Sequence, residues 1–519
     1  MKNNVLVVAA NSKYSHSSLA LRYFRENSGC DIFECSINDN IFDIYTILCE
    51  ADYDIMCFSV YIWNVDFMLK LIPMIKNAKP QIRIILGGPE AGYNYNDLFN
   101  KYDYIDGIIC GEGEDAISAL VNGKENSQIP GFVYRFNENL TKNEVVKVDL
   151  TEIKFPYKKS DMEVLKNKIV YFETSRGCCF NCSYCLSSSE GNTRNFDMKY
   201  VKNGIKFFIE NNVPLVKFVD RTFNENNSRA CEILEFINQH NKNTMFHFEV
   251  APQLITEEFA NLLRSSKGLV QLEMGIQTIN KETMKHIKRV FDTDKIKEKI
   301  SLIPDSIHTH MDLIAGLPKE NLESFINGFN YVYSLNPDML QLGFLKLLHN
   351  TVLKTQADEF GIRVTSFSPY EVLSTYDMSY EDLILLKKVE KAVDKVYNSG
   401  AFKNTLDKLS YISPFELFKQ IGLNIFNKEK QGPISRTELY VTLYEAFGSE
   451  IKRELVVDFL INNPKSNLPE VFSDDRDDLK EIHKILAKSE KYKDVKFRIA
   501  ASCGEIFVVC CGKVDILKM

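Results

Sequence analysis

Short apolar runs alternate with amphipathic segments over residues 1–145 of the chain. The runs at 4–10, 55–59, 82–86 and 107–110 predict buried strands, and the segment 64–78 predicts one of the helices between them. Strands that alternate with helices in this way are typical of an α/β, doubly wound, Rossmann-like domain with a parallel sheet. In such a sheet, ligands bind beyond the carboxyl ends of the strands.

The four predicted strand ends continue into loops that are rich in glycine and small polar residues. Such loops let backbone amides approach a flat or phosphorylated ligand closely. The candidate ligand-binding residues in these loops are Ser12, Tyr14, Ser59, Tyr61, Trp63, Gly87, Gly88, Pro89, Glu90, Gly111 and Glu112.

Between about residues 165 and 365 the strand and helix patterns repeat, which predicts a partial βα barrel. The strand predicted at 214–219 runs directly into Asp220 and Arg221, and barrel enzymes place their chemistry at such strand ends. Further strands are predicted at 245–251, at 268–278 and from Met311 onwards.

Two of these strands carry polar residues with a period of two. His247 and Glu249 share one face of their strand, and Glu273 and Gln277 share one face of the next. Because unpaired polar groups on buried strands are costly, we expect a polar barrel lumen. The alternatives are an ion pair between Glu249 and Arg221 and a core position for His247.

Beyond residue 370 the spacing of apolar residues becomes helical. We expect a helix over 380–397, further helices over 414–460, and a terminal β-hairpin formed by 495–500 and 505–511. The carboxyl-terminal domain is therefore predicted to be mostly helical. The predicted domains are 1–145, 146–366 and 367–519.

Composition is that of a globular enzyme: 519 residues, 45% of them apolar, and a formal net charge of −7. No apolar stretch approaches the roughly 18 residues of a membrane helix, so we expect no membrane partner. The acidic balance disfavours a nucleic-acid partner. An odd total of 13 cysteines argues against a disulfide framework and favours a reducing, cytoplasmic location.

Three cysteines, Cys178, Cys182 and Cys185, stand in a CxxxCxxC spacing just after an apolar strand. Three thiolates in one short loop can hold a [4Fe–4S] cluster and leave its fourth iron open for a chelating ligand. Cys179 offers a second spacing with the last two cysteines, and spacing alone leaves both open. A zinc site is the alternative, but zinc usually takes four ligands from two separated pairs, and no second pair follows nearby.

The motif resembles that of the radical S-adenosylmethionine (SAM) superfamily, in which an aromatic residue such as Tyr184 precedes the last cysteine. The resemblance implies a partial (βα)6 barrel in which SAM binds the open iron and is cleaved to a 5′-deoxyadenosyl radical. It makes Cys178, Cys182 and Cys185 the metal ligands and the catalytic centre. The residues implied to bind SAM are Tyr184 and Gly275 beside the adenine, Arg221 at the carboxylate, Glu249 at the ribose, and also Asp220 and Gln277.

Taken with this motif, the four amino-terminal loops look like the cobalamin-binding domain that precedes many radical SAM domains. The DxHxxG signature of a histidine ligand does not occur, because His16 lacks the preceding aspartate and the following glycine. If cobalamin binds, we therefore expect it without a protein histidine on cobalt. The alternative is a Rossmann-like scaffold that has lost its cofactor.

Segments 218–224, 312–318, 342–348 and 369–373 are similar to those of a bacterial subgroup of cobalamin-binding radical SAM proteins with a carboxyl-terminal domain of unassigned role. Three thiols in the terminal hairpin, Cys503, Cys510 and Cys511, offer ligands for an auxiliary cluster, but in an alternating hairpin they are more typical of core and edge residues.

The resemblance implies a methyltransferase that acts on an unactivated carbon through the radical and methylcobalamin. A second interpretation is a radical SAM reaction of different output, such as rearrangement, cyclisation or aminocarboxypropyl transfer. A third is a cobalamin or redox sensor without catalysis. The expected partners are a small-molecule or peptide substrate and a reductant such as flavodoxin or ferredoxin.

Overall fold

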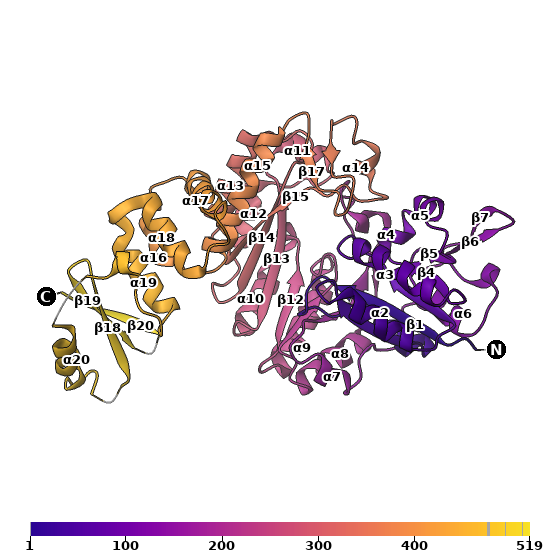
Figure 1. The fold of residues 1–519 in the computed structure, drawn as a ribbon, viewed down its shortest axis with the longest axis horizontal. Helices are drawn as coiled ribbons and strands as arrows, with labels where there is room; N and C mark the ends of the chain where they lie inside the picture. The colour runs from indigo at the N-terminus through magenta and orange to yellow at the C-terminus, as the bar shows by residue number, and fades with distance from the viewer. Residues whose placement is uncertain (1, 475–477, 494, 511, 519) are drawn as a thin grey trace. The chain divides into compact units, whose positions relative to one another are not determined.

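The computed structural model describes residues 2–474, 478–493, 495–510 and 512–518 (Figure 1). The chain forms two compact units, each of which is described by itself. The first unit comprises Met1–Gly275, Met284–Thr309 and Leu345–Thr375, and the second comprises Ile276–Thr283, His310–Phe344 and Tyr376–Met519.

A seven-stranded sheet forms the amino-terminal part of the first unit, in the order β2-β1-β3-β4-β5-β6-β7 (Figure 1). Strands β1 to β5 are parallel, whereas β6 and β7 are antiparallel. The bounds are β1 Val5–Asn11, β2 Asp31–Ser36, β3 Ile55–Ser59, β4 Arg83–Gly87, β5 Gly107–Ile109, β6 Phe132–Phe136 and β7 Asn139–Lys142. The predicted parallel α/β sheet is confirmed. The hydrophobic pattern missed β2, β6 and β7, of which β2 and β7 are the edge strands and are only partly buried.

The alternation of side chains along β1 explains why the sheet is covered on both faces. Val5 and Val7 belong to one apolar core, which α1 (Leu19–Ser28) and α6 (Glu114–Val121) complete. Leu6 and Val8 belong to the other core, with α2 (Ile41–Glu50) and α3 (Val65–Ala78). Short helices follow at α4 Pro89–Gly92, η1 Asn126–Gln128 and α7 Asp161–Val164, and a longer one at α5 Tyr95–Lys101.

Four parallel strands of the barrel pair in the order β13-β12-β11-β8. Their bounds are β8 Val170–Phe172, β11 Leu215–Phe218, β12 Met245–Glu249 and β13 Val270–Gln277, and the last two residues of β13 belong to the second unit. The helices that follow these strands are α8 Met198–Glu210, α9 Asn227–His240 and α10 Glu257–Ser265.

Aromatic side chains on one face of these strands form the core between strands and helices. Phe172, Phe218 and Phe246 are fully buried. Phe172 packs edge-on against Phe208 of α8, with 5.3 Å between ring centroids. The opposite face of the same strands is left for polar side chains, as the alternating pattern predicts.

Smaller elements complete the first unit around the cysteine motif and after the barrel. They are β9 Ser175–Arg176, η2 Leu186–Ser189, β10 Arg194–Asn195, η3 Pro252–Leu254, α11 Lys281–His286, α12 Thr293–Ile300, α14 Val352–Thr355, β16 Arg363–Val364 and β17 Val372–Ser374. The first three residues of α11 belong to the second unit.

The second unit holds the parallel pair β14 (His308–Ala315) and β15 (Met339–Phe344), α13 (Leu322–Ser334) and the carboxyl-terminal helices, except that the first two residues of β14 belong to the first unit. Helix α15 continues as the π-helical turn η4 and ends before Gly400, close to the predicted stop. The helices are α15 Tyr380–Ala392, η4 Val393–Tyr397, α16 Lys403–Lys408, α17 Pro414–Glu429, α18 Arg436–Phe447, η5 Gly448–Ile451, α19 Lys452–Asn462, η6 Glu470–Phe472 and α20 Leu479–Ala487. Among the described residues, no helix is long and apolar enough to cross a membrane.

The end of the chain is a three-stranded antiparallel sheet, where only a hairpin was predicted. Strands β18 (Phe497–Ser502) and β19 (Glu505–Cys510) are the predicted pair, and β20 (Lys513–Lys518) adds a third strand to β19. Cys503 is exposed at the turn and Cys510 ends β19, whereas Cys511 lies outside the described residues.

Two helical glycines offer a matched test of helix packing in the second unit. A Cβ on Gly422 of α17 would lie 2.2 Å from the carbonyl oxygen of Lys388 in α15, so Gly422→Ala must push the helices apart. We expect it to cost about 1–3 kcal/mol. Gly328→Ala in α13 has 3.7 Å to its nearest neighbour atom and should stabilise the helix by about 0.5–1 kcal/mol. Thermal midpoints and hydrogen exchange of α15 and α17 peptides measure both effects. Equal stability of the two variants would contradict the close approach.

Candidate active site

The cysteine motif lies in a loop that begins directly after β9 and is closed by the pairing of β9 with β10. Gly177 starts the loop in the left-handed region at φ +94°, and a Cβ there would lie 2.8 Å from the carbonyl oxygen of Asn192. Only glycine therefore fits this turn. Within the loop, Cys182 is buried, and Cys178 and Cys185 are partly exposed.

The structure distinguishes Cys178 from its neighbour Cys179. The Cys178 sulfur accepts a hydrogen bond from the backbone amide of Phe180 at 3.5 Å and lies 3.6 Å from the Thr222 hydroxyl, in the loop after β11. Cys179 is exposed. This placement favours Cys178 as the ligand, an assignment that stays a prediction.

A half-buried arginine that the sequence analysis missed supports the cysteine loop. Arg289 donates to the Cys182 sulfur at 3.7 Å and to the carbonyl oxygen of Gly275 at 2.5 Å, and its guanidinium lies 5.9 Å from the ring centroid of Phe180. Ser183 anchors the same loop, since its backbone amide donates to the carbonyl oxygen of Ile287 at 3.0 Å. Nothing local in the sequence distinguishes Arg289 from a surface arginine.

Asp220 is bound entirely to the strand that leads into the cysteine loop. Its carboxylate accepts from the Thr174 amide at 2.9 Å, the Thr174 hydroxyl at 2.6 Å and the Ser175 hydroxyl at 2.6 Å. Burial raises the pKa of Asp220 and these donors oppose the rise. Asp220, which was predicted to bind a cofactor, thus fixes the positions of residues 174 and 175.

A charged network lines the polar face of β11, β12 and β13, as the predicted lumen requires. Glu273 accepts from Lys217 at 2.8 Å and lies 2.9 Å from His247 Nε2. Burial raises the pKa of Glu273, but these two partners outweigh it and lower the pKa to about 2. His247 is therefore a partnered, buried histidine. Lys217 was missed, although a lysine within the apolar run 214–219 is a visible signal.

Glu249 is less fully paired than Glu273. Its nearest cation is Lys217, at 4.0 Å, and no ion pair with Arg221 forms. Burial raises the pKa of Glu249, and the charge of Glu273 raises it further. Arg221 interacts electrostatically with Glu249 and with Tyr61, which lies in the loop after β3.

The other residues predicted to bind SAM have distinct surroundings. Tyr184 is partly buried, and burial raises the pKa of its hydroxyl. Gln277 belongs to the second unit, where its backbone is left-handed at φ +69°. Its side-chain oxygen is buried without a hydrogen-bond partner among the described residues.

The loops after β3 and β4 approach each other closely enough to require glycine. Gly88 is left-handed at φ +91°, and a Cβ there would lie 2.5 Å from the carbonyl oxygen of Val60. Beside this contact, Trp63 stacks on Tyr61 with 4.3 Å between ring centroids and 12° between planes. Trp63 remains 47% exposed, so a flat apolar surface faces solvent here.

The remaining residues predicted in these loops are held mainly by backbone contacts. Tyr14 is 60% exposed and donates to the carbonyl oxygen of Asn38 at 2.9 Å, and the carbonyl oxygen of Ser12 accepts from the Asn38 side chain at 3.3 Å. Ser59 is buried, and its carbonyl oxygen accepts from the Asn64 amide group at 3.0 Å. Gly87 ends β4, Pro89 begins α4, and Gly111 is left-handed at φ +86°.

Two predicted corrin residues have carboxylates that bind other protein groups. Glu90 is buried and accepts a hydrogen bond from the Tyr370 hydroxyl. Glu112 accepts from Arg194 and, at 2.7 Å, from the backbone amide of Val148. These two residues would therefore contact a ligand through their backbone atoms and not through their carboxylates.

Arg176, directly before the cysteine loop, joins that loop to the end of β5. Its guanidinium is 2.6 Å from Glu114, 2.7 Å from Glu173 and 3.6 Å from Glu112, and its side chain is only 12% exposed. Burial raises the pKa of Glu173 and Arg176 opposes the rise. Glu114 and Glu173 thus depend on one cation, whereas Glu112 also pairs with Arg194.

His16 is bonded within the protein. Its Nδ1 lies 3.0 Å from the Tyr171 hydroxyl in the barrel. Burial lowers the pKa of His16, and the charges of Lys13 and Lys217 lower it further. One nitrogen of the ring is thus engaged with β8.

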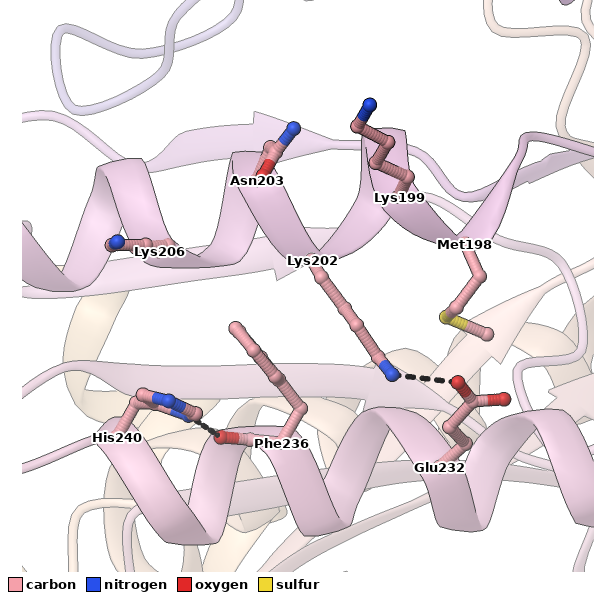
Figure 2. Close-up of a pocket in the computed structure, with 8 residues that line it drawn as sticks. All are labelled: Met198, Lys199, Lys202, Asn203, Lys206, Glu232, Phe236 and His240. Carbon is pink, nitrogen blue, oxygen red and sulfur yellow. Dashed lines mark hydrogen bonds and ion pairs between the residues drawn. The ribbon is translucent and has the colours of Figure 1, made fainter.

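A hollow of about 530 Å³ lies between α8 and α9 (Figure 2). Lys202 crosses it to Glu232 at 2.6 Å, and His240 bonds the carbonyl oxygen of Phe236. No residue predicted for a cofactor lines it. Its lining consists of Met198, Lys199, Lys202, Asn203, Lys206, Glu232, Phe236 and His240.

Three protein-family models match the chain. Residues 5–121 match the B12 binding domain, and residues 172–332 match the radical SAM superfamily. The chain belongs to the radical SAM superfamily and carries a B12-binding domain. Residues 358–503 match a protein family of unknown function, DUF4080.

Curated relatives of this radical SAM protein include methyltransferases. It is 25% identical over 310 residues to the 2-(S-pantetheinyl)-carbapenam-3-carboxylate methyltransferase of Streptantibioticus cattleyicolor, covering 54% of this chain and 44% of the relative. It is 23% identical over 340 residues to the cobalamin-dependent radical SAM methyltransferase TokK of Streptomyces tokunonensis, covering 60% and 50%. The chain thus spans about half the length of these relatives.

Solved structures of cobalamin-dependent enzymes share the fold. OxsB with aqua-cobalamin bound aligns with a TM-score of 0.65 and 13% identity, over 91% of this chain and 82% of OxsB. TsrM from Kitasatospora setae, with cobalamin and a [4Fe–4S] cluster bound, aligns with a TM-score of 0.58 and 16% identity, over 70% and 76%. The predicted order of a Rossmann-like domain, a radical SAM barrel and a mostly helical region is confirmed.

Removing Arg176 from the radical SAM protein tests the buried ion cluster. Arg176→Met leaves Glu173 and Glu114 buried without their cation, which we expect to cost about 3–5 kcal/mol of unfolding free energy. Without Arg176 the folded-state pKa of Glu173 rises further above its usual 4.5. A carboxyl with a raised folded pKa loses its stabilising contribution as the pH rises through that value. The deficit should therefore be larger near about pH 8 than near about pH 5.

Thermal or denaturant unfolding at both pH values measures this deficit. Arg194→Met is the matched control, since it removes one partly exposed pair with Glu112. We expect it to cost at most about 1 kcal/mol. A deficit in Arg176→Met that is equal to the control, or independent of pH, would show that the cluster does not depend on Arg176.

Proposed function

We propose that the protein is a cobalamin-dependent radical SAM methyltransferase that places a methyl group on an unactivated carbon. The observation that carries the proposal is the proximity of the two predicted sites within the first unit. Arg176, directly before the cysteine loop, lies 2.6 Å from Glu114 of the B12-binding domain, and the Tyr93 hydroxyl of that domain lies 3.4 Å from the Ser189 hydroxyl in η2. Radical methylation needs this proximity, because a methyl donor must lie within a few ångströms of the substrate radical.

The cysteine loop fits a [4Fe–4S] cluster. It supplies three thiols, and Arg289 places a positive charge beside one of them, which would offset the negative charge of a thiolate-bound cluster. Among the described residues, no three His, Cys, Asp or Glu side chains gather around a point that could hold a single metal ion. A four-iron cluster needs no such gathering, since each thiolate binds a different iron.

The barrel residues have groups suited to SAM. Arg221 can pair with the carboxylate of SAM, and Glu249, which has only a distant cation, can accept hydrogen bonds from the ribose. Tyr184 and Gly275 would lie beside the adenine. Asp220 acts by holding residues 174 and 175 in place.

The B12-binding domain has a surface suited to a corrin. Exposed Trp63 stacked on Tyr61 offers a flat apolar contact, and Gly88 lets the loops after β3 and β4 approach each other. The DxHxxG signature is absent around His16, so we infer that cobalt has no protein histidine ligand. When bound, the cluster with SAM supplies a carbon-centred radical, and cobalamin supplies the methyl group.

We further propose a small-molecule or peptide substrate and a flavodoxin or ferredoxin as reductant. A cytoplasmic location is supported by the cysteines, because the described ones are free thiols and thiolate ligands need a reducing compartment.

Single cysteine variants test the cluster assignment. Cys178→Ala and Cys182→Ala should each abolish the formation of 5′-deoxyadenosine, because three thiolates are needed to hold the cluster with an open iron. Cys179→Ala should retain it and serves as the control in the same loop. The measurement is product analysis after anaerobic reconstitution with iron and sulfide and reduction in the presence of SAM. Product formation by Cys182→Ala would sink the cluster assignment.

The only tryptophan of the chain gives a direct test of the corrin site. Hydroxocobalamin bound beside Trp63 should quench its fluorescence, because the corrin absorbs in the region of tryptophan emission. Quenching should saturate near one cobalamin per chain, and the desalted protein should hold near-stoichiometric cobalt. Free N-acetyltryptophanamide at equal absorbance corrects for light absorption by the ligand. A cluster without cobalt or saturable quenching would overturn the methyltransferase proposal in favour of another radical SAM reaction.

A further inference from the structure

Residues 349–370, here called the strap, follow the barrel strands and belong to the first unit. The strap begins near α14 and ends in the turn before β17. Its ends are braced, since Leu347 N donates to the Tyr370 carbonyl oxygen at 3.0 Å and Val372 N donates to that of Leu345 at 2.9 Å. The methyltransferase chemistry proposed above assigns it no role.

One end of the strap holds two loops of the B12-binding domain. The Ser368 hydroxyl donates to the carbonyl oxygen of Ile62, next to Trp63. The Tyr370 hydroxyl donates to the carboxylate of Glu90, in the loop after β4. The loops after β3 and β4, which carry most of the predicted corrin contacts, are therefore both fastened to one short turn.

The Glu90 carboxylate is only 4% exposed, so its partners matter. Besides Tyr370, it has His349, whose Nε2 lies 3.4 Å away. Lys354 lies 2.7 Å from His349 Nδ1, and because an ammonium only donates, Nδ1 is the acceptor and Nε2 carries the proton toward Glu90. The Tyr370 hydroxyl and the His349 ring thus face the buried carboxylate, and Lys354 of the strap places a positive charge behind the ring.

The other end of the strap holds the cysteine loop. The backbone amide of Leu353, in α14, donates to the carbonyl oxygen of Ser183 at 2.8 Å. Ser183 stands between Cys182 and Tyr184, and both it and Leu353 are fully buried. A movement of α14 would therefore move the cysteine loop directly.

Tyr370 is held in a strained backbone conformation. Its φ of +58° is in the left-handed region, which is unfavourable for a bulky residue. Such strain persists where surrounding contacts overdetermine the conformation, and it is frequent at functional positions. Here the bonds of Tyr370 to Glu90 and Leu347 supply those contacts.

We propose that the strap sets the separation between the corrin-binding loops and the cluster loop, with Ser368 and Tyr370 as positioning residues. The inference rests on the proposed function in one respect, since it takes both groups to be bound. The coupling of the three loops by the strap does not depend on bound groups, because it is made by protein residues alone.

The test compares the wild type with Ser368→Ala, Tyr370→Phe and the double variant, each of which deletes only a hydroxyl. The control is Ser366→Ala with Tyr376→Phe, where both side chains are exposed. In the protein without added groups, hydrogen exchange of peptides covering 60–64, 87–93 and 181–186 should be about tenfold faster in the double variant than in the control. Unchanged exchange in these peptides would overturn the strap.

The reconstituted protein gives a second readout. In the double variant, hydroxocobalamin should dissociate about tenfold faster. The magnetic interaction between Co(II) and the reduced cluster, measured by electron paramagnetic resonance, should change from one defined strength to a broad distribution. An unaltered interaction in the double variant would overturn the proposal.

Failure of the two proposals can be told apart. A wild type that retains no cobalt contradicts the methyltransferase, whereas hydrogen exchange without added groups still decides whether the strap couples the loops. A wild type that holds both groups, with a double variant like the control in every readout, contradicts the strap alone.

Discussion

The guanidinium of Arg176 is the interaction on which the rest of the first unit depends. It lies directly before the cysteine loop and contacts Glu173 at the end of β8 and Glu114 after β5. Taking several charges out of water is costly unless each finds a partner. Because these partners come from two different sheets, the ion cluster can form only when the B12-binding domain and the barrel are in register. The cysteine loop is thus fixed relative to both.

The charged residues of the barrel lumen fall into two groups, those with a close charged partner and those without one. Lys217, Glu273 and His247 satisfy one another, and the pKa of Glu273, lowered to about 2, keeps that carboxylate charged at any physiological pH. Glu249 and Arg221 have no such close partner in each other. The first three residues satisfy one another, whereas Glu249 and Arg221 remain available to bind a polar ligand at the strand ends.

Supports that lie far apart in the sequence complete the site. Arg289 reaches the Cys182 sulfur from beyond α11, and the strap reaches the loops after β3 and β4 from beyond β15. Glu90 and Glu112 stand in loops that were correctly expected to lie at strand ends, yet their carboxylates are engaged by Tyr370 and Arg194. The glycines of a loop therefore predict where the loop lies, but they do not predict which residues its side chains contact.

The sequence by itself determined the parallel strands β1, β3, β4 and β5, the barrel strands, the helical carboxyl-terminal region and the cysteine spacing. These features depend on local periodicity and on residues close together in the chain, which a sequence displays directly. It did not reveal β2, β20, the roles of Lys217 and Arg289, or the strap. Edge strands and buried charges depend on partners that are tens to hundreds of residues away. The type of a residue does not show which distant partner it has. Only the tertiary structure decided which carboxylates are neutralised by protein and which remain open to a ligand.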